Sequence, residues 1–335
     1  MPTRLALTAL LASVAFATGS STTGRVVDGP GALARLERTD EAMGSWFGLV
    51  MYGPGRAELE AAADAAFEEV HRLDRLLSNY RPASEWSGVN RAAAARPVRV
   101  SPELFDLLSA CLEYSRQSDG AFDITVGPLM KMWGFFRGEG VLPSGPVVTD
   151  ALGRVGYRHV LLEAEGRTVR FLRPGIELDP GGIGKGYAVD RMVSVLREHG
   201  VGIALVSAAG SSIYGLGAPP GEPRGWRVPI SDPSASSRSV ADVYLKDLSI
   251  STSGSYEKFF WAEGRKYAHI IDPRTGYPAR GASSVSVVAA RAIDSEAWTK
   301  PYFVNGRAWT IANRRGDQRV LFCDDTPSAA CSWIQ

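Results

Sequence analysis

The segment that decides the fold is Glu177-Leu178-Asp179-Pro180-Gly181-Gly182-Ile183-Gly184-Lys185-Gly186-Tyr187-Ala188-Val189-Asp190. Glycines before a helix leave backbone N–H groups open to a phosphate at the positive end of the helix dipole, and Lys185 adds a positive charge there. The spacing is not that of a P-loop, because Gly186 rather than Ser or Thr follows the lysine. It does not match a dinucleotide-binding fingerprint either. From these residues alone, a phosphate site and a glycine-rich turn without a ligand both stay open.

Helical and strand-like patterns surround this segment. A helix is predicted over 57–79 from its single apolar face, and Ser101-Pro102 begins a second helix that Gly120 closes. A third helix runs from the glycine segment to Gly200. Strands are predicted at 45–52, 203–207, 226–230, 243–250, 266–271 and 283–289, a hairpin at 157–163 and 168–172, and a helical stretch near 292–304 that Pro301 should bend or break. With no repeat or dividing linker, the chain is predicted to be one mixed α/β or α+β domain.

The overall composition excludes several classes of protein. The 335 residues include 37 Lys and Arg against 36 Asp and Glu, a formal charge of +1, so a general nucleic-acid binder is not expected. Three cysteines are too few for a disulfide scaffold. The four histidines and three cysteines form no His-x-x-x-His or Cys-x-x-Cys pair, which argues against a zinc site.

The first residues predict export. Arg4 precedes an apolar run over 5–17 that ends in Ala15-Phe16-Ala17, the small-x-small pattern of a cleaved signal peptide. The alternative is a buried N-terminal helix, and the run is too short to span a bilayer. We therefore predict a signal peptide over 1–17, a flexible arm over 18–40 and the catalytic domain over 41–335. No cysteine stands near the cleavage point and no later segment is apolar enough for a membrane span, so the mature protein is expected to be soluble and periplasmic or otherwise extracytoplasmic.

Oxidising conditions outside the cytoplasm bear on the cysteines. Cys323 and Cys331 have seven residues between them and could pair. Cys111 lies on an apolar helical stripe and is expected to be a buried small hydrophobic residue.

Two further segments carry polar or aromatic side chains typical of a site. The loop after the second helix holds Asp119 and Asp123, and Met132-Trp133-Gly134-Phe135-Phe136 follows, suited either to a flat-ring ligand or to a hydrophobic core. The segment His269-Ile270-Ile271-Asp272-Pro273-Arg274-Thr275-Gly276 places a histidine and a carboxylate at a strand end, where a structural role is as open as a catalytic one.

Taken in order, these segments resemble the FAD:protein FMN transferase family, also called ApbE-like. The resemblance covers about residues 43–325. Its segments are Met43-Gly44-Ser45, Leu77-Ser78-Asn79-Tyr80, Ser84-Glu85-Trp86-Ser87-Gly88-Val89-Asn90, Gly120-Ala121-Phe122-Asp123, Trp133-Gly134-Phe135, the glycine segment, Ser251-Thr252-Ser253-Gly254-Ser255-Tyr256, the His269 segment and Ser284-Val285-Ser286-Val287-Val288-Ala289.

The resemblance implies a fold, an activity and a site. The fold would be a single α+β domain of ApbE-like (T-fold-like) architecture, with mixed sheets packed by helices. Members bind FAD, use Mg²⁺ and transfer FMN to a threonine of a partner flavoprotein, releasing AMP. The FAD site would be lined by Met43, Tyr80, Ala121, Phe122, Asp123, Asp179, Lys185 and Ile271. The family's acceptor motif, roughly Asp-Gly-x-Thr/Ser-Gly/Ala-Thr, is absent from this chain, so the acceptor should be another protein.

The metal position departs from the family pattern. The family's Asp-x-x-x-Thr pair falls on Glu296-Ala297-Trp298-Thr299-Lys300, with Glu for Asp and Lys for Thr. The candidate Mg²⁺ ligands are Glu296, the backbone of Gly182 and Thr299, which is one position away from the family's threonine. The resident cation is either that ion or the Lys300 ammonium. A second departure is Ala209-Gly210-Ser211-Ser212-Ile213, where many members have Gly-Gly-Asp-Ile.

The candidate catalytic residues are His269, Asp179 and Lys185. Phosphoryl transfer needs positioning and neutralised charge, which Lys185 would supply, and His269 or a nearby carboxylate would take the threonine proton. Two other functions stay open: an FAD pyrophosphatase that gives FMN and AMP, and an exported FAD-binding protein without activity.

Overall fold

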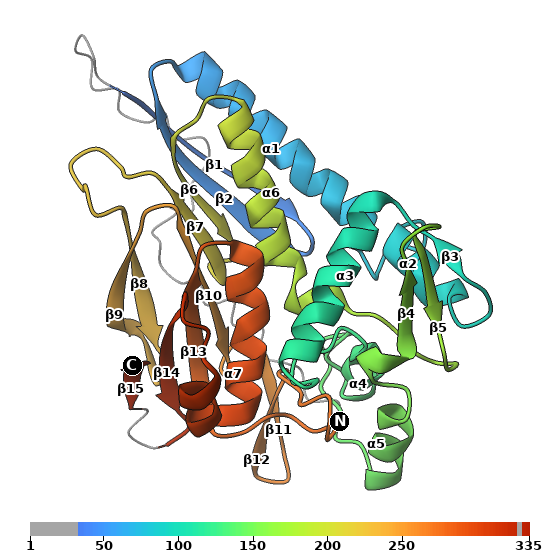
Figure 1. The fold of residues 1–335 in the computed structure, drawn as a ribbon. Coiled ribbons are helices and arrows are strands. Elements are labelled where there is room, and N and C mark those ends of the chain that lie inside the picture. The colour runs from blue at the N-terminus through green and yellow to red at the C-terminus, as the bar shows by residue number, and fades with distance from the viewer. Residues whose placement is uncertain (1–32, 327–329) are drawn as a thin grey trace.

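An eight-stranded antiparallel sheet forms the frame of the computed structural model, which describes residues 33–326 and 330–335 (Figure 1). Each strand pairs antiparallel with its neighbours. The strands in spatial order are β1 (Ala34–Ala42), β2 (Ser45–Gly53), β6 (Ile203–Ala208), β7 (Ser212–Leu216), β10 (Leu248–Gly254), β13 (Ala282–Ala289), β14 (Arg319–Asp324) and β15 (Cys331–Ile334). The fold is therefore mixed helix and sheet, as predicted.

Three long helices cover one face of this sheet (Figure 1): α1 (Arg56–Leu77), α6 (Gly184–Glu198) and α7 (Ala292–Asn313). The buried positions of α1 follow the helical period and pack with those of α6 against β1, β2 and β6. Pro301 does not end α7. The non-helical residue is Gly306, whose φ of 80° is the left-handed conformation that glycine adopts without strain. The predicted break is therefore displaced from Pro301 to Gly306.

A hairpin covers the opposite face of the sheet. Strands β8 (Trp226–Asp232) and β9 (Ala235–Leu245) bury apolar side chains against those of β2, β6, β7, β10, β13 and β14. The indole Nε1 of Trp226 donates to the carbonyl of Leu216, 3.0 Å away, and so fixes the hairpin to β7.

Most of the remaining elements lie on the right in Figure 1, and the hairpin over 259–268 lies at the bottom. Some of them share a core with α7 and β13, where Tyr114 Oη donates to Asp294 Oδ1 at 2.5 Å, and the others form a smaller, aromatic core. The remaining elements are α2 (Glu85–Ala92), α3 (Pro102–Gln117), α4 (Gly127–Met132), α5 (Gly145–Leu152), the 3₁₀ turns η1 (Tyr157–His159) and η2 (Pro180–Gly182), the sheet β3 (Val98–Arg99), β5 (Thr168–Phe171), β4 (Val160–Glu163), and the hairpin β11 (Phe259–Ala262) and β12 (Arg265–Ala268).

Several predicted boundaries need correction. The single strand predicted over 243–250 is two, because β9 ends at Leu245 and β10 begins at Leu248 after a turn in which Asp247 has a φ of 54°. The strand predicted over 266–271 ends at Ala268, and the first residues of the predicted hairpin form η1. Residues 34–40, expected to belong to the flexible arm, pair with β2 as part of β1. Residues 18–32 of the arm and the predicted signal peptide lie outside the described residues.

The structure answers the question of pairing that the sequence left open, and it confirms the buried Cys111. Cys323 and Cys331 face each other across β14 and β15 and form a disulfide, and Cys111 is a buried thiol. Within the described part of the chain, no helix is both long and apolar enough to cross a bilayer.

Candidate active site around the start of helix α6

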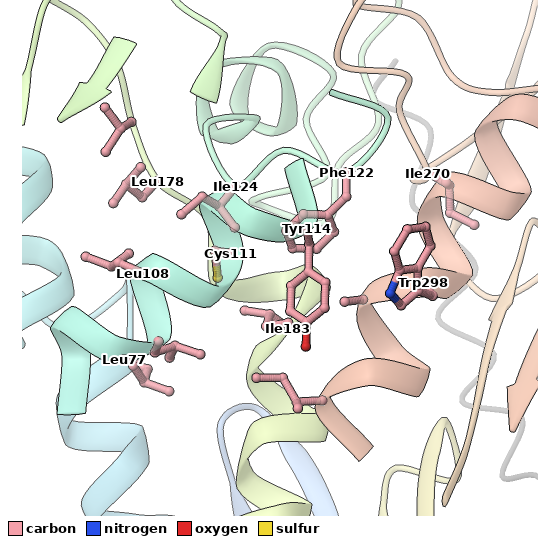
Figure 2. Close-up of a cluster of buried hydrophobic side chains, with 14 of the residues drawn as sticks. Leu77, Leu108, Cys111, Tyr114, Phe122, Ile124, Leu178, Ile183, Ile270 and Trp298 are labelled. Atoms are coloured by element: carbon pink, nitrogen blue, oxygen red, sulfur yellow. The ribbon is translucent and has the colours of Figure 1, made fainter. Parts of the chain in front are cut away.

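The residues 179–186, called the glycine turn below, are held by helix α2. The indole Nε1 of Trp86 and the amide of Asn90 both donate to the carbonyl of Leu178, at 3.0 and 2.9 Å, and the Asn90 Oδ1 accepts from the Leu178 N–H at 2.7 Å. Figure 2 shows Leu178 and Ile183 buried beside Cys111 of α3. The turn therefore enters α6 between two buried anchors, with Gly181 exposed and Gly184 and Gly186 buried.

Asp179 fastens the turn from within. Its Oδ1 accepts from the Gly181 N–H at 2.7 Å and its Oδ2 from Asn79 Nδ2 at 3.1 Å. Burial raises the pKa of this carboxyl, and the same two hydrogen bonds oppose the rise. Because both oxygens are engaged, Asp179 shapes the turn that receives a ligand and is poorly placed to take a proton from it.

Helix α6 begins without a side-chain cap and against helix α7. Ile183, at the N-cap position, offers no side-chain acceptor to the first N–H groups. The N–H of Gly186, in the first turn of the helix, donates to Glu296 Oε2 at 2.6 Å. A methyl group on Gly186 would lie 2.3 Å from the Ala292 carbonyl oxygen, so only glycine permits this approach of α6 to α7. The positive end of the α6 dipole thus has no N-cap side chain of its own, and a carboxylate of α7 already accepts one of its N–H groups.

Three lysines, called the lysine cluster below, surround this helix start: Lys185, Lys258 and Lys300. Lys185 Nζ donates to Ser211 Oγ at 2.6 Å, and Lys300 Nζ donates to the Glu296 carbonyl at 3.0 Å. Burial and the charge of Lys185 lower the pKa of Lys300 to about 8, and Glu296 partly offsets that fall. The pKa of Lys258 is lowered in the same way, by burial and by Lys185. A bound anion would stabilise the charged forms of Lys258 and Lys300, both of which the charge of Lys185 opposes.

His269 lies within the field of all three lysines. Its Nδ1 is 3.1 Å from the Lys258 carbonyl oxygen, which can only accept, so Nδ1 carries the proton and Nε2 has the free lone pair. Burial and the neighbouring charges of Lys258 lower its pKa to about 3. The imidazole is therefore neutral at ordinary pH, with its lone pair on Nε2.

A further carboxylate, besides that of Glu296, lies among these cations. Glu257, at the start of the loop after β10, feels the charges of all three lysines, which lower its pKa against the larger effect of burial, which raises it. Its ionised form is attracted to all three lysines, and Glu296 acts on Lys300 in the same way.

The predicted FAD-lining residues divide into two groups. Met43 has a φ of 52°, and its Cε would be 3.2 Å from a methyl group placed on Gly184, so it covers the helix start. Phe122 Cε2 would lie 3.4 Å from a methyl group on Gly182. Tyr80 is 66% exposed and stacks on Phe136 at 4.4 Å between ring centroids, which leaves one ring face open to the solvent. These residues border the glycine turn.

The other predicted residues serve the core beneath it. Ala121 is buried, and Asp123 is buried with its oxygens accepting from Thr125 and from the Tyr157 N–H. Ile271 packs in an aromatic core with Trp133, Phe135, Phe260 and Tyr267. Trp133 therefore belongs to the core, while Phe136 stacks on Tyr80 beside the site. The aromatic segment over 132–136 thus contributes both to the hydrophobic core and to the border of the site, the two roles that its sequence left open.

The predicted metal ligands do not form a metal site. One oxygen of Glu296 is bound by the Gly186 N–H, and its other oxygen is 4.0 Å from Lys300 Nζ. Thr299 Oγ1 does not turn in: it lies 2.7 Å from Ser253 Oγ and donates to the Glu296 carbonyl at 2.7 Å. Among the described residues, no three His, Cys, Asp or Glu side chains gather in a group that could hold a metal ion. The residues present do not fit the octahedral oxygen shell that Mg²⁺ requires.

Several site residues were not predicted from sequence. Asn79, Trp86 and Asn90 lie in segments that resemble the family. Apart from that resemblance, the only feature of the sequence that could have indicated their role is a polar or indole group next to a buried helix. Glu257 and Lys258 have no signal of their own, because only the pairing of β11 with β12 brings them beside His269.

Comparisons with known proteins agree with this geometry. Residues 43–322 match the ApbE family. The chain is 35% identical over 264 residues to the FAD:protein FMN transferase of Treponema pallidum (strain Nichols), covering 75% of this chain and 73% of that one. It is 32% identical over 293 residues to a Klebsiella pneumoniae (strain 342) protein of the same name, covering 85% of this chain and 90% of that one.

Solved structures show the same fold. The ApbE protein of Thermotoga maritima superposes with a TM-score of 0.80 at 30% identity, covering 89% of this chain and 96% of that one. The flavin transferase ApbE of Vibrio cholerae also gives a TM-score of 0.80, at 26% identity, covering 90% of this chain and 96% of that one. The family match, the curated relatives and the shared fold lead to one conclusion: this chain belongs to the ApbE family.

Proposed function

We propose that this protein is a FAD:protein FMN transferase, which moves FMN from FAD to a threonine of a partner flavoprotein and releases AMP. The family membership and the name of its relatives support the activity. The observation that carries the proposal is the lysine cluster at the uncapped start of α6, since three cations beside a helix N-terminus suit a pyrophosphate.

FAD would be bound through its charge and its rings. Its pyrophosphate would lie against the glycine turn, where the charges of the lysine cluster would compensate its negative charge. The open face of Tyr80 offers a stacking surface for one of the two ring systems, beside the turn that Asp179 fastens.

The reaction needs a proton acceptor and a stabilised leaving group. The threonine hydroxyl oxygen forms a bond to the FMN-side phosphorus while the bond from that phosphorus to the bridging oxygen breaks, and that oxygen leaves with AMP. The hydroxyl proton would pass to Nε2 of His269, whose tautomer the Lys258 carbonyl holds. Lys185 and Lys300 would balance the charge that develops on the phosphate oxygens.

The same site could in principle use water as acceptor, and one incubation distinguishes the outcomes. The protein is mixed with FAD and an acceptor domain that carries the Asp-Gly-x-Thr/Ser-Gly/Ala-Thr motif. In-gel flavin fluorescence reports labelled acceptor, and chromatography reports AMP and FMN. Labelled acceptor with equimolar AMP supports the proposal. AMP with free FMN and no labelled acceptor would make the protein a pyrophosphatase, and unchanged bound FAD would make it a binding protein.

Export through a signal peptide over 1–17 is the compartment we propose. Arg4, the apolar run and Ala15-Phe16-Ala17 support it, and so does the Cys323–Cys331 disulfide, since such bonds persist in oxidising compartments. N-terminal sequencing of the protein from the envelope fraction should begin at Thr18. An intact Met1 on protein from the cytoplasm would refute the proposal.

A further inference from the structure

The residue Lys300 stands where a site of this kind needs a cation. It lies on α7, one helical turn after Glu296, and its Cε would be 3.5 Å from a methyl group placed on Gly182. Its side chain therefore reaches across to the glycine turn, and it does not point away into the solvent. The Lys300 Nζ lies 3.0 Å from the Glu296 carbonyl oxygen and 4.0 Å from Glu296 Oε1.

The oxygen atoms around Lys300 are arranged for an ammonium group and not for a metal ion. Glu296 Oε2 is turned toward the Gly186 N–H at 2.6 Å, which leaves one oxygen for a cation. The Thr299 hydroxyl, the nearest substitute for the family's threonine, is committed to Ser253 and to the backbone of α7. Mg²⁺ would need more oxygen ligands near 2.0–2.1 Å, and a protonated lysine offers no lone pair to one.

We infer that the Lys300 ammonium is the resident cation of this site, and that the protein binds FAD and transfers FMN without a divalent metal ion. The inference rests on the proposed function, and it names the group that holds the pyrophosphate. An ammonium has three donors, and the contact with the Glu296 carbonyl uses one of them. The other two are available to phosphate oxygens above the glycine turn.

The surroundings explain how a buried cation is tolerated there. Burial is the largest influence on Lys300 and opposes its charged form, as the charge of Lys185 does, while Glu296 and Glu257 favour it. The charge of Lys300 is therefore only partly compensated when the site is empty. The two negative charges of a bound pyrophosphate would favour the charged form of Lys300, so no metal ion would be needed to compensate them.

The test compares FAD affinity with and without metal in four proteins. Wild type, Lys300→Thr, Lys300→Met and the control Lys246→Thr are treated with EDTA, desalted, and titrated with FAD by flavin fluorescence in EDTA or in MgCl₂. Lys246 is exposed on the turn that precedes β10, at the end of that strand opposite Ser253, so it controls for loss of a lysine charge elsewhere. Thermal melting of each variant confirms that it is folded, and calorimetric titration with MgCl₂ in the presence of FAD reports metal binding directly.

The expected results separate the inference from the proposed function. Wild type and Lys246→Thr should bind FAD equally in EDTA and in MgCl₂. Lys300→Met should bind FAD about tenfold or more weakly under both conditions, as for a lost charge-assisted contact. Lys300→Thr should lose affinity in EDTA, regain it in MgCl₂, and bind Mg²⁺ where wild type does not.

A wild type that binds FAD in MgCl₂ but not in EDTA would overturn the inference and leave the proposed function standing. So would a folded Lys300→Met variant with unchanged affinity. A wild type that binds no FAD under either condition would contradict the proposed function as well as the inference that rests on it.

Discussion

Replacing Gly186 with alanine should destabilise the protein and loosen the site at the same point. The added methyl group would lie 2.3 Å from the Ala292 carbonyl oxygen, 2.8 Å from its carbonyl carbon and 3.0 Å from Glu296 Cβ. Two of these atoms are backbone, so the clash can be relieved only if α6 and α7 move apart. That movement lengthens the 2.6 Å bond from the Gly186 N–H to Glu296 Oε2.

The size of the effect is a balance of opposing terms. Forcing an extra methyl group into a packed contact typically costs about 1–3 kcal/mol. Weakening a buried hydrogen bond to a charged group costs about 1.5–3 kcal/mol more when the bond is lost entirely. Alanine favours a helix over glycine by about 1 kcal/mol, which offsets part of this loss. We expect Gly186→Ala to lower the free energy of unfolding by about 1–3 kcal/mol.

Equilibrium unfolding in urea, followed by circular dichroism, measures this change. Gly202→Ala is the matched control, because a methyl group there meets no atom within 4 Å and the backbone conformation is ordinary; its change should stay within about 0.5 kcal/mol. If Gly186→Ala is as stable as Gly202→Ala, the close approach of α6 to α7 does not hold the site, and the reasoning is refuted.

Two other predictions concern titratable groups. Asp190 accepts from the first two backbone N–H groups of α7 at 2.7 and 2.9 Å, and burial raises its pKa from 3.8 to about 6. The folded state therefore binds more protons than the unfolded state between these values, so this carboxyl makes the free energy of unfolding fall as the pH rises from about 4 to about 6. Urea unfolding across that range should show the slope in wild type and lose it in Asp190→Asn, and an identical slope in both would exclude the assignment. Because the pKa of His269 is lowered to about 3, kcat/KM for FMN transfer should show no acid limb from this histidine between pH 7 and 5, while His269→Ala should lower kcat by about 10²-fold or more. An acid limb near 6.5 that disappears in His269→Ala would show an ordinary, solvated histidine.

Much of the helical layer could be predicted because its signals are local. Helix α3 begins where Ser101 and Pro102 place it, with Ser101 Oγ accepting from the Leu104 N–H, and α1 follows its apolar period. The turn that separates β9 from β10 could not be found, since Lys246 and Asp247 carry no glycine or proline signal and the positive φ of Asp247 depends on its surroundings. The order of the eight strands depends on pairings between distant segments, which no local pattern specifies.

The residues of the site likewise divide into those that a local sequence pattern predicts and those that only the tertiary structure brings together. The glycine turn and Lys185 could be predicted from one segment of sequence, because a phosphate site of this kind has closely spaced glycines before a helix. The role of Asp179 as a fastener, and not as a base, is visible only once Asn79 is folded beside it. Lys258 joins the site through tertiary structure alone. Glu296 and Lys300 depart from the family's sequence pattern, which leaves either Lys300 or a metal ion as the cation of the site. Only the positions of the Thr299 hydroxyl and the Lys300 ammonium distinguish these alternatives.

The most direct test of flavin transfer is the intact mass of an acceptor domain after incubation with this protein and FAD in EDTA. The acceptor carries the Asp-Gly-x-Thr/Ser-Gly/Ala-Thr motif, and a copy with its final threonine replaced by alanine is the control. We predict that the motif-bearing acceptor gains the mass of one FMN less one water, while the control acceptor stays unmodified. An unmodified motif-bearing acceptor, both in EDTA and after addition of MgCl₂, would contradict the proposed transferase activity.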